Sequence, residues 1–164
     1  MVPMVNDREQ AEAVVRALRF PPLGARSYGG RRVIDLDGRN FHRERELLLL
    51  AQIETIEAVQ NAEEIIRTDG VDGLFFGPDD MKCQMQIPTD TPLTADERLL
   101  AALQRTARVA TDAGKFCGTV AADPQTARAC LDAGCRLLVA GGDSGFLRHG
   151  SARAMEMIRG VVEA

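Results

Sequence analysis

Short apolar runs alternate with amphipathic stretches along this chain. The run at residues 47–50 leads into the polar segment Gln52-Ile53-Glu54, and the run at residues 74–76 leads into Gly77-Pro78-Asp79-Asp80. Apolar runs this short that end in polar residues are typical of buried parallel strands. The pattern therefore predicts two parallel strands, each followed by a polar turn.

A helix is predicted between these strands. Thr55 is a candidate N-cap, positions 56, 59, 65 and 66 form an apolar face, and Gly70 ends the helix. A strand–helix–strand unit places Glu54 and Asp80 at the carboxyl ends of neighbouring strands, and in α/β barrels that end of the sheet carries the chemistry. By pattern alone, the two carboxylates fit helix-capping or ion-paired acids as well as metal ligands.

The same alternation extends over the whole chain. Five strand–helix units are predicted, at residues 1–19, 47–69, 72–113, 116–133 and 136–162. Alternating units of this kind imply an α/β fold with a parallel sheet and right-handed crossovers. Five units can form an open doubly wound sheet or five eighths of a (β/α)₈ barrel. No GxGxxG or GxxxxGK[ST] turn follows an early strand, which disfavours the nucleotide-binding open sheet.

Three further helix starts are predicted from capping residues. Asn6 with Glu9 and Thr94 with Glu97 have the spacing of a capping box, and Asp123 precedes Pro124 at a first helical position. We expect residues 1–164 to form a single domain.

Two segments carry alternative interpretations. Residues 24–46 are rich in Gly and Arg and are the longest stretch without clear periodicity. They fit a solvated loop that contacts another subunit, or an anion-binding or lid segment near an active site. Residues 141–145 form a glycine-rich turn before the last predicted helix, which fits a simple strand-to-helix turn or a phosphate site.

Composition and charge exclude several classes of protein. Hydrophobic residues make up 45% and charged residues 27% of the chain, as in globular proteins. A net charge of −4 argues against nucleic acid or an anionic membrane as the main partner. No apolar run approaches membrane length, so we expect a cytoplasmic protein. The four cysteines show no CxxC spacing and are interpreted as reduced thiols.

Several motifs together resemble the HpcH/HpaI aldolase family of class II pyruvate aldolases. They include Val2-Pro3-Met4-Val5, the turn at residues 20–27, Gln52-Ile53-Glu54-Thr55, Gly77-Pro78-Asp79-Asp80-Met81 and Gly141-Gly142-Asp143. The specific part of the resemblance is the motif at residues 52–55 followed, at this spacing, by the motif at residues 77–81. It implies a partial (β/α)₈ TIM-barrel fold in which the first predicted strand takes the place of the family's fourth.

The resemblance also implies a function and a site. The family's metal ligands correspond to Glu54 and Asp80, which would bind Mg²⁺, Mn²⁺ or Co²⁺. The side chain of Gln52 and the backbone at Gly77 and Asp79 would contact a pyruvate-like 2-oxo acid. The implied reaction is the reversible aldol cleavage of a 4-hydroxy-2-oxo acid to pyruvate and an aldehyde.

One departure from the family pattern bears on catalysis. The family's histidine-containing acid/base motif and its enolate-stabilising arginine belong to the first three strands, and neither His42 nor His149 matches them. No catalytic acid or base is therefore assigned, and we expect impaired turnover. The alternatives are a non-catalytic half-barrel module and a phosphate-ligand-binding α/β domain. Because five units cannot close a barrel, we also expect a homo-oligomer.

Overall fold

A four-stranded parallel sheet forms the centre of the molecule. The computed structural model describes residues 1–44 and 46–162. The strands pair in the order in which they occur: β1 (Leu50–Ile53), β2 (Gly73–Phe76), β3 (Phe116–Val120) and β4 (Leu137–Val139). This confirms the α/β class and the parallel sheet.

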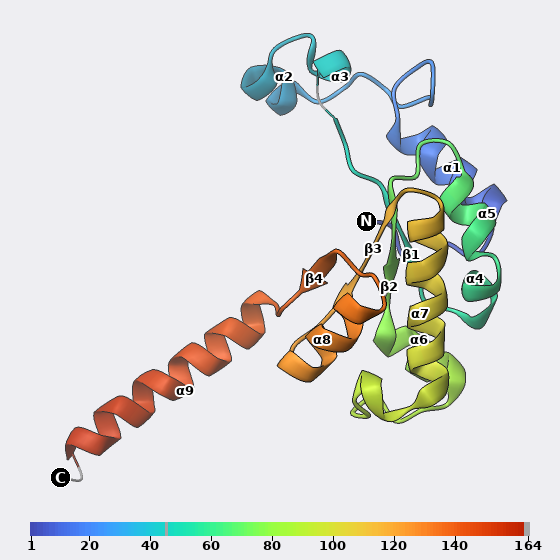
Figure 1. Ribbon diagram of the computed structural model, residues 1–164. Helices are drawn as coiled ribbons and strands as arrows, with labels where there is room; N and C mark the ends of the chain where they lie inside the picture. Colours follow the sequence, from blue (N-terminus) through green and yellow to red (C-terminus); the bar gives the residue numbers. More distant parts are fainter. Residues whose placement is uncertain (45, 163–164) are drawn as a thin grey trace.

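Helices connect the strands and cover the sheet (Figure 1). Contacts with the strands and with one another place α5 and α7 against the sheet, with α1 packed on α5. The helices are α1 (Arg8–Leu18), α2 (Arg31–Asp37), α3 (Phe41–Glu44), α4 (Ile56–Gln60), α5 (Ala62–Arg67), α6 (Pro78–Met85), the 3₁₀ turn η1 (Leu93–Ala95), α7 (Glu97–Asp112), α8 (Pro124–Asp132) and α9 (Asp143–Val162).

The predicted first strand is reduced to a bridge. Val2 pairs with Ala51 in parallel, and its N–H donates to the Leu50 carbonyl at 2.9 Å. Met4 then has a left-handed backbone with φ of 56°, which interrupts the ladder. The prediction of five strands is therefore wrong for the described residues, although the N-terminal segment does lie along β1.

Two of the predicted helix caps are confirmed. The Thr55 hydroxyl accepts the N–H of Ala58 at 3.0 Å. The Asp123 carboxylate accepts the N–H of Thr126 at 2.8 Å.

The other two caps were predicted one or two residues too early. Asp7 caps α1 instead of Asn6, whose side chain accepts the Thr55 hydroxyl at 2.6 Å and is therefore engaged elsewhere. Asp96 caps α7, while Thr94 lies in the preceding 3₁₀ turn. In both cases an aspartate lies next to the first helical turn; it is a stronger cap than Thr94 and about as strong a cap as Asn6.

The core lies between the sheet and the adjacent helices. Its fully buried side chains include Ile53, Leu74 and Phe76 from the strands and Leu99 and Leu103 from α7. The helix predicted between the first two central strands divides at Asn61 into α4 and α5. Ile65 and Ile66 are buried as predicted, but Ile56 is 45% exposed because it begins the short α4 on the solvent side.

Two segments extend away from the sheet in Figure 1. The stretch predicted to lack periodicity contains the short helices α2 and α3. Helix α9 has no buried residue over its whole length and continues the chain outward from β4. Within the described chain, none of the helices combines the length and apolar character needed to cross a membrane.

Candidate functional site

Glu54 is a buried carboxylate at the carboxyl end of β1. Only 4% of the residue is exposed. Its Oε2 accepts the backbone N–H of Met4 at 3.0 Å, and its Oε1 accepts the side-chain amide of Gln52 at 2.7 Å. Both carboxylate oxygens are therefore held by donors of the protein.

Gly77 makes room for this carboxylate. Ile53 pairs with Phe76 across the two strands, so the residues that follow them, Glu54 and Gly77, are neighbours. A Cβ atom at position 77 would lie 2.5 Å from both Cγ and Oε1 of Glu54. A side chain of any size at this position would displace the carboxylate.

Asp80 lies within electrostatic range of Glu54. It belongs to the first turn of α6 and is exposed, and its negative charge helps to raise the pKa of Glu54. The structure thus places Glu54 and Asp80 at the carboxyl ends of β1 and β2, as the strand–helix–strand pattern predicts, with Gln52 bonded to Glu54.

The segment after β2 differs from the expected loop. Pro78 is at a first-turn position of α6, where its missing N–H costs nothing because that group would have no partner inside the helix. The Gly77 N–H donates to the Ile53 carbonyl at 3.1 Å and is not free for a ligand. The predicted backbone contact with a substrate carboxylate consequently depends on the N–H groups of Asp79 and Asp80, which have no acceptor within the helix.

The electrostatics of Glu54 favour a bound cation. Burial raises the pKa of its carboxyl above the ordinary value, the Met4 N–H opposes that shift, and the charge of Asp80 adds to it. In the described part of the chain, neither carboxylate forms an ion pair with a lysine or arginine. A buried carboxylate beside a second one, without a compensating positive charge, is unfavourable.

The donor set suits a divalent metal ion with oxygen ligands. Carboxylate oxygens are the groups that Mg²⁺ and Mn²⁺ prefer, and Mg²⁺ usually retains several water molecules beside one or two carboxylates. Over residues 1–44 and 46–162, no three His, Cys, Asp or Glu side chains come together in a metal-binding group. Glu54 and Asp80 would therefore be the two protein ligands, and the other positions would remain open to water and substrate.

The raised pKa of Glu54 predicts a specific pH dependence of stability. A carboxyl whose folded-state pKa exceeds its unfolded value stabilises the fold at low pH, and this contribution is lost as pH rises through the folded pKa. Relative to Glu54→Gln, the metal-free wild-type chain should therefore lose stability as pH rises above about 4.5, the ordinary value. Urea denaturation of both chains in a chelator, from acidic to neutral pH, measures this difference. A constant difference would contradict the prediction.

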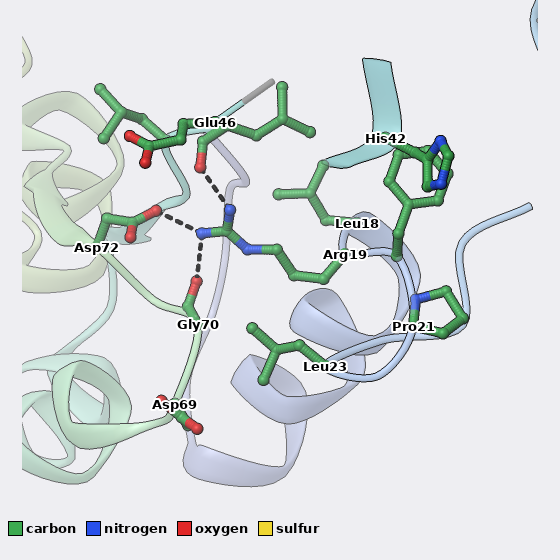
Figure 2. Close-up of a pocket in the computed structure, with 12 residues that line it drawn as sticks. Leu18, Arg19, Pro21, Leu23, His42, Glu46, Asp69, Gly70 and Asp72 are labelled. Carbon is green, nitrogen blue, oxygen red and sulfur yellow. Dashed lines mark hydrogen bonds and ion pairs between the residues drawn. The ribbon is translucent and has the colours of Figure 1, made fainter. Parts of the chain in front are cut away.

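A cavity lies at the opposite end of the sheet from Glu54 (Figure 2). It has a volume of about 520 Å³ and is lined by residues that precede β1 and β2, including Leu47 and Asp72. Arg19 points into this region and donates to the carbonyls of Leu47 and Gly70 at 2.6 and 2.8 Å and to Asp72 at 2.6 Å. In α/β barrels the amino end of the sheet usually contributes to stability, whereas the carboxyl end carries the active site. We therefore place the candidate site at Glu54.

The other predicted features contribute less. The Asp79 carboxylate accepts the ammonium group of the buried Lys82 at 3.1 Å, which makes Asp79 an ion-paired acid. At the glycine-rich turn, the Asp143 carboxylate accepts the N–H of Ser144 at 2.7 Å, so a negative charge already lies at the start of α9. That arrangement disfavours the phosphate alternative.

Comparison with known proteins identifies the family. The sequence profile of the HpcH/HpaI aldolase/citrate lyase family matches residues 1–150. The chain belongs to this family. It is 38% identical over 156 residues to a hydroxypyruvate/pyruvate aldolase of Delftia acidovorans and 35% identical over 164 residues to a 2-keto-3-deoxy-L-rhamnonate aldolase of Klebsiella pneumoniae. A crystal structure of an HpcH/HpaI family protein from Burkholderia cenocepacia superposes with a TM-score of 0.81 at 27% identity.

The match covers nearly the whole chain but only part of each relative. It includes 91%, 97% and 97% of this chain, against 56%, 60% and 64% of the Delftia, Klebsiella and Burkholderia proteins, respectively. The family and the partial-barrel fold are established by these matches, while the activity of a complete relative is not thereby assigned to this chain.

One contact at the site could not be predicted from the sequence. The donor to Glu54 from Met4 is a backbone N–H, which every residue except proline carries. No residue type marks such a donor, and only the path of the chain reveals it.

Proposed function

We propose that this chain provides the metal-binding and 2-oxo-acid-binding part of an aldolase-type carbon–carbon lyase. The observation that carries the proposal is Glu54, a buried carboxylate at the same end of the sheet as Asp80 that forms no ion pair with a lysine or arginine among the described residues. The aldolase names of its relatives favour a pyruvate-type substrate with an aldehyde as the second product.

The residues of this chain would bind and orient the substrate. Glu54 and Asp80 would hold a divalent cation, which supplies Lewis-acid stabilisation of negative charge on a bound 2-oxo acid. The Gln52 amide has two N–H groups, of which one donates to Glu54, so the other is available to the 2-oxo acid. The first-turn N–H groups of α6, starting at Asp79, would favour the substrate carboxylate.

No general acid or base is assigned among the described residues around Glu54. Loss of a positioned acid or base typically costs on the order of 10² to 10⁴ in rate. The proposal therefore includes impaired turnover by this chain alone, with binding retained.

Pyruvate binding and methyl-proton exchange test the proposal. We expect pyruvate to bind only in the presence of Mg²⁺ or Mn²⁺, as followed by calorimetry, and Glu54→Gln and Asp80→Asn to remove this binding. Deuterium exchange into the pyruvate methyl group, followed by NMR, should be slow and should require the metal and both carboxylates. Asp79→Asn is the matched control, because the neighbouring Asp79 carboxylate pairs with Lys82; it should retain metal binding.

Each result bears on a different part of the proposal. Pyruvate binding without metal, or unchanged in both carboxylate variants, would contradict the assigned site. Exchange at the rate of a complete aldolase would contradict impaired turnover. Loss of metal binding in Asp79→Asn and not in Asp80→Asn would move the second ligand to Asp79.

Association of the chain and its cytoplasmic location stay predictions. The large apolar side chains of α9 favour association, because Phe146, Leu147, Ile158 and Val161 are each more than half exposed. A helix with this much exposed apolar surface is typical of a contact with another molecule or segment.

A further inference from the structure

The path of residues 2–5 along β1 contains one extra residue. Val2 pairs regularly: its N–H donates to the Leu50 carbonyl at 2.9 Å, and its carbonyl accepts the Gln52 N–H at 2.8 Å. A regular parallel ladder would next join the N–H of residue 4 to the Gln52 carbonyl. Instead, the Val5 N–H donates to that carbonyl at 3.3 Å. Residues 4 and 5 therefore form a β-bulge, which shifts the register by one.

This bulge directs a backbone donor to the candidate metal ligand. Met4, with φ of 56°, turns its N–H away from the ladder and donates it to Oε2 of Glu54 at 3.0 Å. A methionine in the left-handed region is uncommon, and such residues persist where the surrounding structure holds them, often at functional sites. The Met4 side chain is not part of the core, since the residue is 45% exposed.

Gln52 supplies the second donor from β1 itself. Residues 52 and 54 lie on the same face of an extended chain, because side chains alternate along a strand. The Gln52 amide donates to Oε1 of Glu54 at 2.7 Å. The two donors approach different oxygens and, with the close approach of Gly77, leave the carboxylate one orientation.

We infer that the Met4 bulge and Gln52 are positioning groups for Glu54 and that they set the affinity of the chain for a divalent cation. Gln52 thus acts on metal binding before any substrate is present, in addition to a contact with a 2-oxo acid. This inference rests on the proposed function, since it requires Glu54 to be a metal ligand. Groups that orient a ligand typically contribute 10-fold to 100-fold in metal affinity.

Titration with Mn²⁺ in the absence of any 2-oxo acid tests the inference. Gln52→Leu removes one donor to Glu54 and should raise the Mn²⁺ Kd roughly 10-fold or more. Met4→Ile retains the N–H but disfavours the left-handed backbone, because β-branched residues rarely adopt it, and should also raise the Kd. Met4→Gly permits this backbone conformation without steric cost and should keep the Kd within about 2-fold of wild type.

Matched controls separate positioning from a loss of stability. Thr119→Val removes a buried hydrogen bond of 2.9 Å to the Phe76 carbonyl, at the same end of the sheet. It should lower the thermal unfolding midpoint without changing the Mn²⁺ Kd. The EPR spectrum of bound Mn²⁺ should change in Gln52→Leu and Met4→Ile but not in Thr119→Val or Met4→Gly.

The outcomes distinguish this inference from the proposed function. A wild-type Mn²⁺ Kd in Gln52→Leu, with weaker pyruvate binding only, would show that Gln52 acts on the substrate alone and would overturn the inference. The same holds if Met4→Gly and Met4→Ile bind Mn²⁺ equally. If wild type and Glu54→Gln bind Mn²⁺ equally poorly, the proposed metal site itself fails, and the inference fails with it.

Discussion

Gly77→Ala is expected to weaken divalent-metal binding on the order of 100-fold and to lower the free energy of unfolding by about 1–3 kcal/mol. The added methyl group would lie 2.5 Å from Cγ and Oε1 of Glu54, far inside van der Waals contact. Because φ of Gly77 is −96°, an ordinary value for any residue, the effect would be steric and not a matter of backbone freedom. The Glu54 carboxylate would have to leave its donors on Met4 and Gln52.

A double-mutant cycle isolates this contact. In a Glu54→Ala background the added methyl group has no carboxylate to displace, so most of the stability loss of Gly77→Ala should disappear. Gly142→Ala is the matched control, since no atom lies within 4 Å of a Cβ built there. Calorimetric Mn²⁺ titration and urea denaturation measure both quantities. An unchanged Mn²⁺ Kd in Gly77→Ala would contradict the assigned role of Glu54.

Arg19→Met is expected to lower the free energy of unfolding by about 2 kcal/mol. The guanidinium group joins the segment after α1 to the starts of both β1 and β2, through the Leu47 and Gly70 carbonyls and the Asp72 carboxylate (Figure 2). Asp72 also accepts the Leu49 N–H at 2.6 Å, so loss of Arg19 leaves this carboxylate without its counter-charge. The side chains remain 17% and 33% exposed, which keeps the expected cost below that of a fully buried pair.

A surface ion pair provides the comparison for Arg19. Arg67 pairs with Glu63 at 3.1 Å, and their side chains are 62% and 64% exposed. Arg67→Met should therefore change the free energy of unfolding by less than about 0.5 kcal/mol. Urea denaturation of the two variants at neutral pH gives the values. Equal effects would show that Arg19 does not hold the strand ends together.

Several features of the fold were predictable because they depend on local sequence. Strand β2 contains the predicted apolar run at residues 74–76, whereas β1 lies at residues 50–53, at the end of the predicted run at 47–50, and includes Gln52. The helix that follows β1 is capped by the Thr55 hydroxyl, as predicted. Parallel strands joined by a helix must end at the same edge of the sheet. Glu54 and Asp80 could therefore be placed together before the structure was known.

Other features were predicted wrongly because neighbouring residues compete for the same cap or the same place in a ladder. Asp7 and Asp96 cap their helices in place of Asn6 and Thr94, since an adjacent carboxylate accepts the first-turn N–H groups instead. The first strand is interrupted at Met4, although residues 1–5 have the composition of a strand. Composition alone does not show where a ladder changes register.

The sequence by itself determined the α/β class, the resemblance to the HpcH/HpaI family and the candidate ligands Glu54 and Asp80, because these follow from residue type and spacing. Only the tertiary structure decided how Glu54 is held. The Met4 N–H comes from the peptide backbone, and the space beside Gly77 exists only because Ile53 pairs with Phe76. Such contacts depend on strand register and chain path, which arise when distant segments pack together.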